Sequence, residues 1–343
     1  MKMKKIILST VLVAAMLFSL MGCSKLPDTS GDTSQTGTAD PTTAPATEAP
    51  ADTGEAAPSS DKIVVGYAPT TMNNAFWLAV LDGVKAVAGE NNIEVVTIDP
   101  QNDQSKMNDQ IGDLLASGID ALLVAPMDSA GVKDALQACK DAGVPVINFD
   151  TPVVDKDMVA SIIASDNYNA GVVVAQDMMA KLEKGSKVFI MHSPSGQACI
   201  DRYNGFVETA GDYFEIVGEL DGKGDTGVTL PLAEDALQAN PDLGAFFAVN
   251  DPSAMGCIQA LAAHPESQGV LVYGVDGNPD AKQLIKEGTM TGTGAQSPET
   301  IGKLSMETAI KVINGESVES NIVVDTFIIN SDNVDQYGTD GWQ

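Results

Sequence analysis

Short runs of apolar, often β-branched residues alternate with segments of helical periodicity from residue 62 onward, and this alternation constrains the fold most strongly. The apolar runs lack polar alternation, which is typical of parallel strands buried on both faces. We expect strands over residues 63–68, 93–98, 121–124, 144–149, 159–164, 187–191, 215–218, 245–249 and 269–275. Apolar residues at helical spacing predict helices over residues 74–89, 104–116, 129–142, 169–182, 229–239, 253–263 and 301–314. The pattern predicts an α/β fold with doubly wound parallel sheets, and the length from 62 to 343 favours two lobes over one domain.

The first residues have the features of an export signal. Lys2, Lys4 and Lys5 precede an apolar run over residues 6–20. A spanning helix is the alternative, but the run is shorter than the roughly 20 apolar residues that a bilayer requires. Residues 20–23 (LMGC) resemble a bacterial lipobox, which implies a signal peptide over 1–22 and lipid attachment at Cys23. The protein would then be held at the membrane through this lipid anchor alone.

Residues 23–61 contain few large apolar side chains and many Thr, Ser, Pro, Ala, Gly and Asp residues. Such a segment buries too little surface to offset the entropy of ordering it, so we predict a flexible tether. A glycosylated stalk is an alternative for the same composition.

Composition excludes several classes of function. The formal net charge of −28 becomes −31 without the three lysines of the signal, which argues against a nucleic-acid partner. No GxGxxG, GxxxxGKS or GxSxG motif follows a predicted strand. The two histidines and the unclustered Cys139, Cys199 and Cys257 give no metal or disulfide signature. We therefore expect no cofactor, no metal and no enzymatic activity.

Polar and aromatic residues follow the predicted strands, where ligands bind in open α/β sheets. Asn, Asp, Gln and Arg side chains form directed hydrogen bonds with adjacent hydroxyl groups, and aromatic rings stack on the apolar face of a sugar. The first strand is followed by residues 70–77 (TTMNNAFW), and others by Asp150, Asn250-Asp251, Asp276-Gly277 and Gln296.

Each of these residues also has a purely structural interpretation. Phe76 and Trp77 are alternatively core residues, although adjacent helix positions cannot both face one core stripe. Asn74 and Asn250 are alternatively helix N-caps, and a residue at a helix start facing a cleft can both cap and bind. The other interpretations are turn carboxylates at Asp150 and Asp276, and a surface ion pair of Arg202 with Asp201 or Glu208.

The whole region 62–330 resembles the periplasmic sugar-binding proteins of the ribose/galactose type, which feed ATP-driven (ABC) importers. The matching stretches are residues 71–77 (TMNNAFW), 126–129 (PMDS), 147–150 (INFD), 164–167 (ASDN), 250–251 (ND), 273–280 (YGVDGNPD) and 295–302 (AQSPETIG). Together these motifs are specific for the family, although none is so alone.

The resemblance implies a type I periplasmic binding protein fold, with two lobes joined by three crossings near Ser165, Gln296–Ser297 and Asp325. The N-terminal lobe would comprise residues 62–165 and 297–325, and the C-terminal lobe residues 166–296 and 326–343. Such a protein captures a small sugar-like ligand by hinge closure, acts as a monomer and presents the closed form to importer permease subunits.

The resemblance also implies roles for single residues. Thr70, Asn74, Phe76 and Trp77 would line one wall, with the aromatic rings stacked on the ligand. Asp150 would accept hydroxyl protons, and Arg202 would supply a guanidinium group from the second lobe. Asn250, Asp276 and Gln296 would complete the polar ring.

Three positions depart from the ribose-binding pattern. Thr151 stands where that subgroup has Arg, Ala125 where it has Asn, and Gly224 where an aromatic side chain is expected. A larger sugar, a polyol, a nucleoside or a furanose signal molecule therefore stays open as the ligand.

Other functions remain to be weighed. A sensor that presents its closed form to a chemoreceptor or sensor kinase is equally compatible with the sequence. A glycosidase using Asp150 and Asp276 requires a defined carboxylate separation, which the sequence does not give. The export signal argues against a transcription repressor of the same architecture.

Overall fold

The computed structural model describes residues 62–343. The predicted signal peptide, the tether and Cys23 lie outside the described residues.

The first sheet contains six strands in the order β11-β5-β4-β3-β1-β2, and all of its neighbouring strands pair in parallel. We call the part built on this sheet the N lobe. Its strands are β1 (Val64–Ala68), β2 (Glu94–Thr97), β3 (Ala121–Val124), β4 (Val146–Phe149), β5 (Ser161–Ser165) and β11 (Asn321–Val324).

The second sheet also contains six strands, in the order β12-β10-β9-β8-β6-β7, and we call the part built on it the C lobe. Its strands are β6 (Lys187–His192), β7 (Glu215–Asp221), β8 (Leu243–Ala248), β9 (Leu271–Asp276), β10 (Gly292–Ala295) and β12 (Phe327–Asn330). One strand departs from the parallel arrangement, because β12 is antiparallel to β10. Only residues 325–326 separate β11 in the first sheet from β12 in the second. The chain therefore enters the second sheet at the end where its parallel strands finish, and β12 runs in the opposite direction to them.

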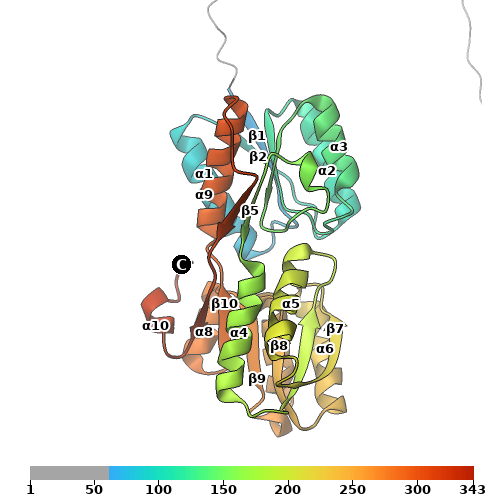
Figure 1. The fold of residues 1–343 in the computed structure, drawn as a ribbon, viewed down its shortest axis with the longest axis vertical. Helices are drawn as coiled ribbons and strands as arrows, with labels where there is room; N and C mark the ends of the chain where they lie inside the picture. Colours follow the sequence, from blue (N-terminus) through green and yellow to red (C-terminus); the bar gives the residue numbers. More distant parts are fainter. Residues whose placement is uncertain (1–61) are drawn as a thin grey trace, which may run out of the picture. The chain divides into compact units, whose positions relative to one another are not determined.

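Helices cover both faces of each sheet (Figure 1). In the N lobe, α1 (Ala75–Glu90) and α9 (Pro298–Ile313) pack together on one face, and α2 (Gln104–Ser117) and α3 (Lys133–Ala142) pack on the other. In the C lobe, α4 (Asn167–Lys181) and α5 (Gln197–Ala210) form one layer. Its other layer contains α6 (Thr226–Ala239), α7 (Asp251–Ala263) and α8 (Pro279–Glu287). The predicted fold class, two α/β lobes with parallel sheets, is confirmed.

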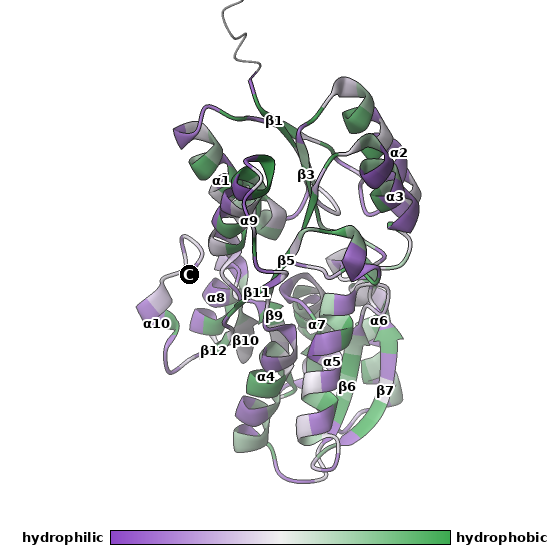
Figure 2. Cartoon of the chain, turned by 45° about the horizontal axis from the view of Figure 1, so that its top comes forward, coloured by the Kyte–Doolittle hydropathy of each residue, from purple (hydrophilic) through white to green (hydrophobic). Residues whose placement is uncertain are grey.

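Three short helices complete the described structure: η1 (Lys156–Met158), η2 (Pro265–Ser267) and α10 (Val334–Tyr337). The sequence pattern does not predict β10, β11, β12, α5, α8 or α10 as elements. Figure 2 shows hydrophobic residues along strand β6, whereas helix α4 carries both hydrophobic and hydrophilic residues. The buried strands and amphipathic helices together account for one core layer on each side of each sheet.

Several helices begin at Asn or Asp residues whose side chains accept a hydrogen bond from the first helical turn, which satisfies otherwise unpaired backbone N–H groups. These N-caps are Asn74, Asp103, Asp166, Asp225, Asn250 and Asn278. In βα units the helix starts lie near the carboxyl ends of the strands, so capping side chains gather at the edge where ligands bind.

The chain passes between the two sheets three times: after β5, after β10 and between β11 and β12. These passages lie beside Ser165, Gln296 and Asp325. Trp342 packs against the N-lobe core layer of α1 and α9, whereas Gly341 and Gln343 accept hydrogen bonds from Lys282 of α8 in the C lobe. The last residues therefore contact both lobes.

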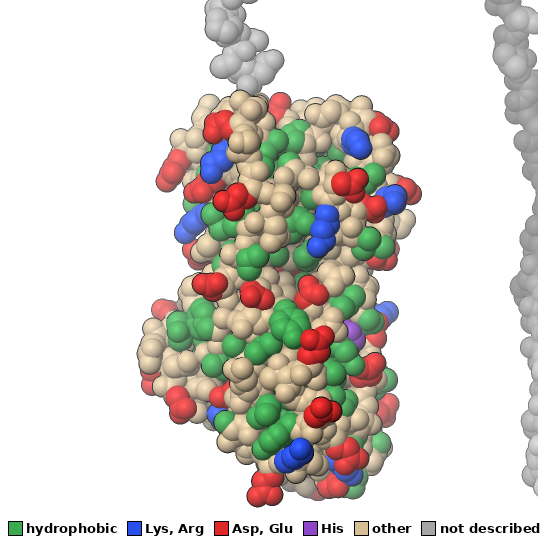
Figure 3. All heavy atoms as spheres, viewed as in Figure 1, with side chains coloured by type: hydrophobic (Ala, Val, Ile, Leu, Met, Phe, Trp, Pro, Cys, Tyr) green, Lys and Arg blue, Asp and Glu red, His purple; other side chains and the backbone are tan. Residues whose placement is uncertain are grey.

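Acidic side chains are spread over the face seen in Figure 3, with fewer lysines and arginines between them, in keeping with the net charge of −28. Among the helices of residues 62–343, none is both long and apolar enough to span a bilayer.

Candidate functional site

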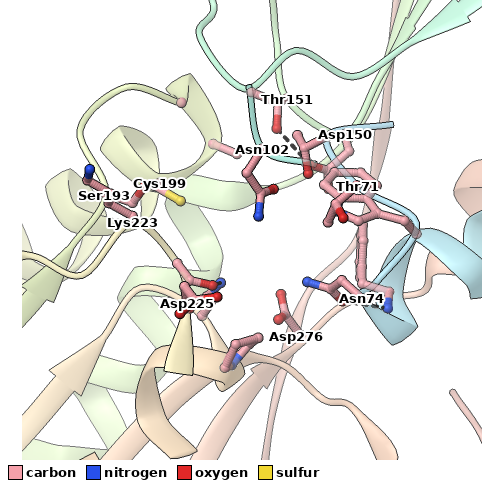
Figure 4. A pocket seen from close by; sticks show the side chains of 18 of the residues that line it. Thr71, Asn74, Asn102, Asp150, Thr151, Ser193, Cys199, Lys223, Asp225 and Asp276 are labelled. Carbon is pink, nitrogen blue, oxygen red and sulfur yellow. Dashed lines mark hydrogen bonds between the residues drawn. The ribbon is translucent and has the colours of Figure 1, made fainter. Parts of the chain in front are cut away.

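A cavity of about 340 Å³ lies between the lobes, at the carboxyl ends of their strands. The volume falls in the range typical of small-molecule sites. All nine side chains predicted to bind ligand line this cavity: Thr70, Asn74, Phe76, Trp77, Asp150, Arg202, Asn250, Asp276 and Gln296. Figure 4 shows the labelled side chains of both lobes around one central space. Their roles in binding stay a prediction.

The loop after β1 forms one wall of the cavity. Asp99 holds this loop, because its Oδ1 accepts from the backbone N–H of Met72 at 3.0 Å and the hydroxyl of Thr71 at 3.5 Å. The side chain of Asn74 caps α1 by accepting from the N–H of Phe76 at 2.9 Å. Asn74 also lines the cavity, so the same residue both caps the helix and faces the candidate site.

Phe76 and Trp77 belong both to the N-lobe core and to the cavity wall. Their rings meet edge to face with centroids 5.0 Å apart, and Trp342 contacts Phe76 in the same manner at 5.7 Å. The hydroxyl of Tyr67 donates to the carbonyl oxygen of Trp77 at 2.8 Å, which fixes the start of α1. The aromatic wall is therefore anchored by packing and by a hydrogen bond, and core packing and cavity lining do not exclude each other.

Asp150 follows β4 in a left-handed backbone conformation, with φ of +57°. The buried amide of Asn148 holds this turn by donating to the carbonyl oxygens of Val124 and Thr151, each at 2.9 Å. Oδ2 of Asp150 accepts from the Thr151 hydroxyl at 2.8 Å, whereas Oδ1 is buried without a hydrogen-bond partner among residues 62–343. Burial raises the pKa of the Asp150 carboxyl, an effect that the nearby charge of Arg202 opposes.

Arg202 is buried in the C lobe. Its Nε donates to Oδ1 of Asn167 at 2.8 Å, and its Nη1 donates to the carbonyl oxygen of Val249 at 2.9 Å. The ion pair of Nη1 with Oδ1 of Asp276 is longer, at 3.5 Å. A surface ion pair is therefore excluded for Arg202, which is 4% exposed.

The position of Arg202 depends on a close contact between α4 and α5. A Cβ atom at Gly171 would lie 2.0 Å from the carbonyl oxygen of Arg202, and one at Gly205 would lie 2.0 Å from that of Tyr168. The two backbones touch at these glycines, because any side chain there would separate the helices.

Asp276 ends β9, and Gln296 directly follows the neighbouring strand β10. Oδ1 of Asp276 accepts from Nε2 of Gln296 at 2.7 Å, and Oε1 of Gln296 is buried without a partner in the described part of the chain. Burial raises the pKa of Asp276, and the charges of Asp251 and Asp150 raise it further against the opposing effect of Arg202.

Asn250 caps α7 by accepting from the N–H of Ser253 at 3.0 Å, and its Nδ2 donates to the carbonyl oxygen of Gly224 at 3.0 Å. Gly224 has a φ of +65°, and a Cβ atom there would lie 2.9 Å from Nδ2 of Asn250. This geometry favours glycine, because a side chain there would adopt a strained backbone conformation and would crowd the amide of Asn250.

Backbone strain is concentrated around the cavity. Six residues other than glycine have positive φ within 62–343, and four of them line the cavity: Asn102, Asp150, Lys223 and Asp276. Such conformations are uncommon and persist where the surrounding structure enforces them, often at binding sites. The clustering is consistent with a function at this site.

The cavity has further lining residues that the sequence analysis does not single out. They include Thr71, Asn73, Asn102, Met127, Ser193, Cys199, Lys223, Asp225, Met255, Asn278 and Asp280. Asn102 follows β2 and Lys223 follows β7, so examining every strand end would have found both. Burial raises the pKa of the Cys199 thiol to about 11, so this residue contributes a neutral thiol. No group of His, Cys, Asp or Glu within residues 62–343 has the composition of a metal site.

The family model described as "Periplasmic binding protein domain" matches residues 65–317. The ribose import binding protein RbsB of Bacillus subtilis is 34% identical over 262 residues, which span 76% of this chain and 85% of that protein. Its Escherichia coli namesake is 33% identical over 78% of this chain and 90% of its own length. These matches are to binding proteins and not to enzymes.

Solved structures show the same architecture. An ABC transporter solute binding protein from Mycobacterium smegmatis with bound glycerol superposes with a TM-score of 0.77 and 30% identity, covering 82% of this chain and 99% of that one. From the matched family model, the identity to relatives and the two-lobed fold, we conclude that this chain belongs to the periplasmic binding protein family.

Proposed function

We propose that this chain is a lipid-anchored, extracytoplasmic solute-binding protein that captures a monosaccharide or similar small hydroxylated solute for an ABC importer. Capture occurs by closure of the lobes about their three crossings, without chemical conversion of the ligand. The monomeric closed form is then recognised by the permease subunits.

The observation that carries this proposal is a pair of buried, unpartnered acceptor atoms on two side chains that line the cavity, among residues 62–343. Oδ1 of Asp150 and Oε1 of Gln296 receive no hydrogen bond from residues 62–343, although both side chains are at least nine-tenths buried. Leaving such groups unpaired costs about 1–3 kcal/mol each, so a ligand rich in hydroxyl donors is favoured there. The aromatic wall of Phe76 and Trp77 complements the apolar face of a sugar ring.

The relatives support this class of ligand. The names of the B. subtilis and E. coli relatives specify ribose, and a structure from Actinobacillus succinogenes at 25% identity holds D-allose. Thr151 and Gly224 line the cavity here, while Ala125 is fully buried outside it. These departures from the ribose-binding pattern favour a hydroxylated solute other than ribose.

The anchor is proposed from the lipobox-like residues 20–23, with acylation at Cys23 and residence at the outer face of the cytoplasmic membrane. A Cys23→Ser variant expressed in a bacterial host tests this part. We expect it to leave the membrane fraction, whereas retention in the membrane would contradict the lipid anchor.

A thermal-shift panel on residues 60–343 tests the binding function. The panel contains pentoses, hexoses, polyols, nucleosides and furanose signals. A ligand at 100 times its Kd adds about 2.7 kcal/mol, which raises the Tm by roughly 5–10 °C at this chain length. Asp150→Ala should lose the shift, while the matched change Asp141→Ala, at an exposed position outside the cavity, should keep it. The absence of a shift with every hydroxylated compound would contradict the proposal.

A further inference from the structure

The charges around the cavity are not balanced. Six charged side chains line it, four acidic (Asp150, Asp225, Asp276 and Asp280) and two basic (Arg202 and Lys223). Lys223, Asp225 and Asp280 are exposed at the rim, where water screens their charges. The deeper charges are those of Asp150, Asp276 and Arg202, which are 4–6% exposed. The ionised cavity therefore carries an excess of negative charge both at its rim and in its interior.

Arg202 compensates this excess incompletely. Its shortest hydrogen bonds go to Asn167 and Val249, at 2.8 and 2.9 Å, and it approaches Asp276 only to 3.5 Å. Asp251, which is fully buried behind Asp276, adds a further carboxyl that accepts from Thr293 at 2.7 Å and from the N–H of Asn278 at 2.9 Å. The guanidinium thus sits among buried carboxyls without a tight ion pair to any of them among the described residues.

Asp150 and Asp276 lie on opposite sides of the cavity, one from each lobe (Figure 4). Oδ1 of Asp150 has no partner within residues 62–343, and Oδ2 of Asp276 has only a long contact, 3.4 Å, with the N–H of Asp251. Hydroxyl donors would satisfy these oxygens, but they would leave the negative charge uncompensated. A ligand that contributes both donors and a positive charge satisfies both requirements.

We propose that the preferred ligand carries a protonated amine as well as hydroxyl groups, as an amino sugar or an aminocyclitol does, and that its ammonium group lies between Asp150 and Asp276. This inference rests on the proposed function, because it names the class of solute that the same cavity selects. An ammonium group attracted by a carboxylate of each lobe also favours closure, because it lies close to both carboxylates only when the lobes have approached each other.

The titration of the two carboxyls supports the same arrangement. Burial raises the pKa of both Asp150 and Asp276, so their ionised forms are disfavoured in the empty cavity. A bound cation restores the ionised forms, so binding of an amine should release protons to the solvent near neutral pH. The affinity should consequently increase as the pH rises from 5 to 7.5, while the amine of the ligand stays protonated.

Calorimetric titration of residues 60–343 with matched ligand pairs tests the inference. Each pair differs by one amine in place of one hydroxyl: glucosamine and glucose, galactosamine and galactose, and an amino-inositol and its parent inositol. We expect at least one amine to bind about tenfold or more tighter than its hydroxyl partner, the scale of one charge-assisted hydrogen bond. Titrations in two buffers of different ionisation enthalpy should show proton release with the amine and little with the hydroxyl partner.

Asp150→Asn and Asp141→Asn form a matched pair of variants. Asn preserves the shape of Asp and tolerates the positive φ of residue 150, and Asp141 is exposed and lies outside the cavity. Asp150→Asn should reduce the preference for the amine to less than about threefold, whereas Asp141→Asn should preserve it.

The outcomes separate the two proposals. If neutral sugars bind as tightly as the amines, or tighter, the amine inference is overturned while the sugar-binding function stands. If the amine preference survives Asp150→Asn unchanged, the assigned position of the ammonium is wrong. If no compound of either kind binds, the proposed function fails and the inference fails with it.

Discussion

Ser129 of the N lobe caps helix α5 of the C lobe at its first residue, Gln197. The Ser129 hydroxyl accepts a hydrogen bond from the Gln197 N–H at 3.0 Å, and the Ser129 N–H donates to the carbonyl oxygen of Ser195 at 3.3 Å. The N-cap residue of this helix, Gly196, has no side chain to satisfy the first turn. Because the same helix carries Arg202, approach of the lobes and capping of a cavity-lining helix are coupled.

Ser129→Ala should weaken ligand binding without changing the cavity. Loss of an N-cap costs about 0.5–2 kcal/mol, and this cap forms only when the lobes are together, so the Kd should rise about two- to thirtyfold. Calorimetry with a ligand from the thermal-shift panel measures the change. Ser117→Ala, at the end of α2, removes a local hydrogen bond to Leu114 and serves as the control with unchanged Kd. An unchanged Kd in Ser129→Ala would show that this cap does not contribute to closure.

Arg202→Ala should lower the stability of the empty protein as well as its affinity. The side chain donates to Asn167 and Val249 in the buried C lobe, and its removal leaves the Asp276 carboxyl without a nearby cation. Breaking a buried pair by removing one partner costs about 3–5 kcal/mol, which urea denaturation would detect. Lys223→Ala, which removes an exposed cation from the same cavity, should change the unfolding free energy by less than about 0.5 kcal/mol. Equal stability of the two variants would contradict the structural role of Arg202.

The stability of the empty protein should fall as the pH rises, in part because of Asp276. Burial raises the pKa of Asp276 in the folded state above its value in the unfolded chain. The protonated carboxyl therefore contributes fully to the stability below the ordinary carboxyl pKa near 4, and this contribution is lost as the pH rises through the higher folded-state pKa. We expect the Tm of the wild-type protein to decline more between pH 5 and pH 8 than that of Asp276→Asn. Asp280→Asn, exposed at the rim, should follow the wild type. Parallel declines in all three proteins would exclude a contribution from Asp276.

The end of the chain should stabilise the molecule through a buried lysine. Nζ of Lys282, a fully buried residue, donates to the carbonyl oxygen of Gly341 at 2.7 Å and to Oε1 of Gln343 at 3.2 Å. Removal of residues 339–343 strips these acceptors and the contact of Trp342 with Phe76, which should cost about 2–4 kcal/mol in unfolding free energy.

The variant Lys282→Met distinguishes the lost hydrogen bonds from the lost packing. Combined with the truncation, it should recover part of the stability, because an apolar side chain needs no acceptor. A combined variant no more stable than the truncated chain would show that the buried ammonium is not the source of the loss.

The sequence pattern located strands β1 to β9 and helices α1 to α4, α6, α7 and α9 within a few residues of their bounds. It missed the short apolar strands β11 (NIVV) and β12 (FIIN), and it also missed elements that depend on tertiary context. Strand β10 has the sequence GTGA, in which two glycines weaken any strand preference, and it forms because β9 and β12 pair with it. Helix α5 packs through Gly205 against the backbone of Tyr168 in α4, a contact between helices that apolar periodicity does not reveal.

The site was predictable where binding residues directly follow a recognisable strand, as at Thr70, Asp150 and Asp276. The sequence analysis missed Asn102 and Lys223, which follow β2 and β7 and reach the cavity from loops with positive φ. The charge excess inside the cavity could not be inferred either. It depends on which partners Arg202 contacts, and these come from α4 and from the residue after β8.

Tryptophan fluorescence offers the most direct test of ligand capture between the lobes. The chain has two tryptophans, Trp77 and Trp342, and both contact Phe76 at the cavity wall. Titration of residues 60–343 with a small hydroxylated solute should produce a saturable change in emission, with the same Kd as calorimetry, that Asp150→Ala abolishes and Asp141→Ala retains. A solute that binds by calorimetry but leaves the emission unchanged, or binds Asp150→Ala equally well, would contradict capture in this cavity.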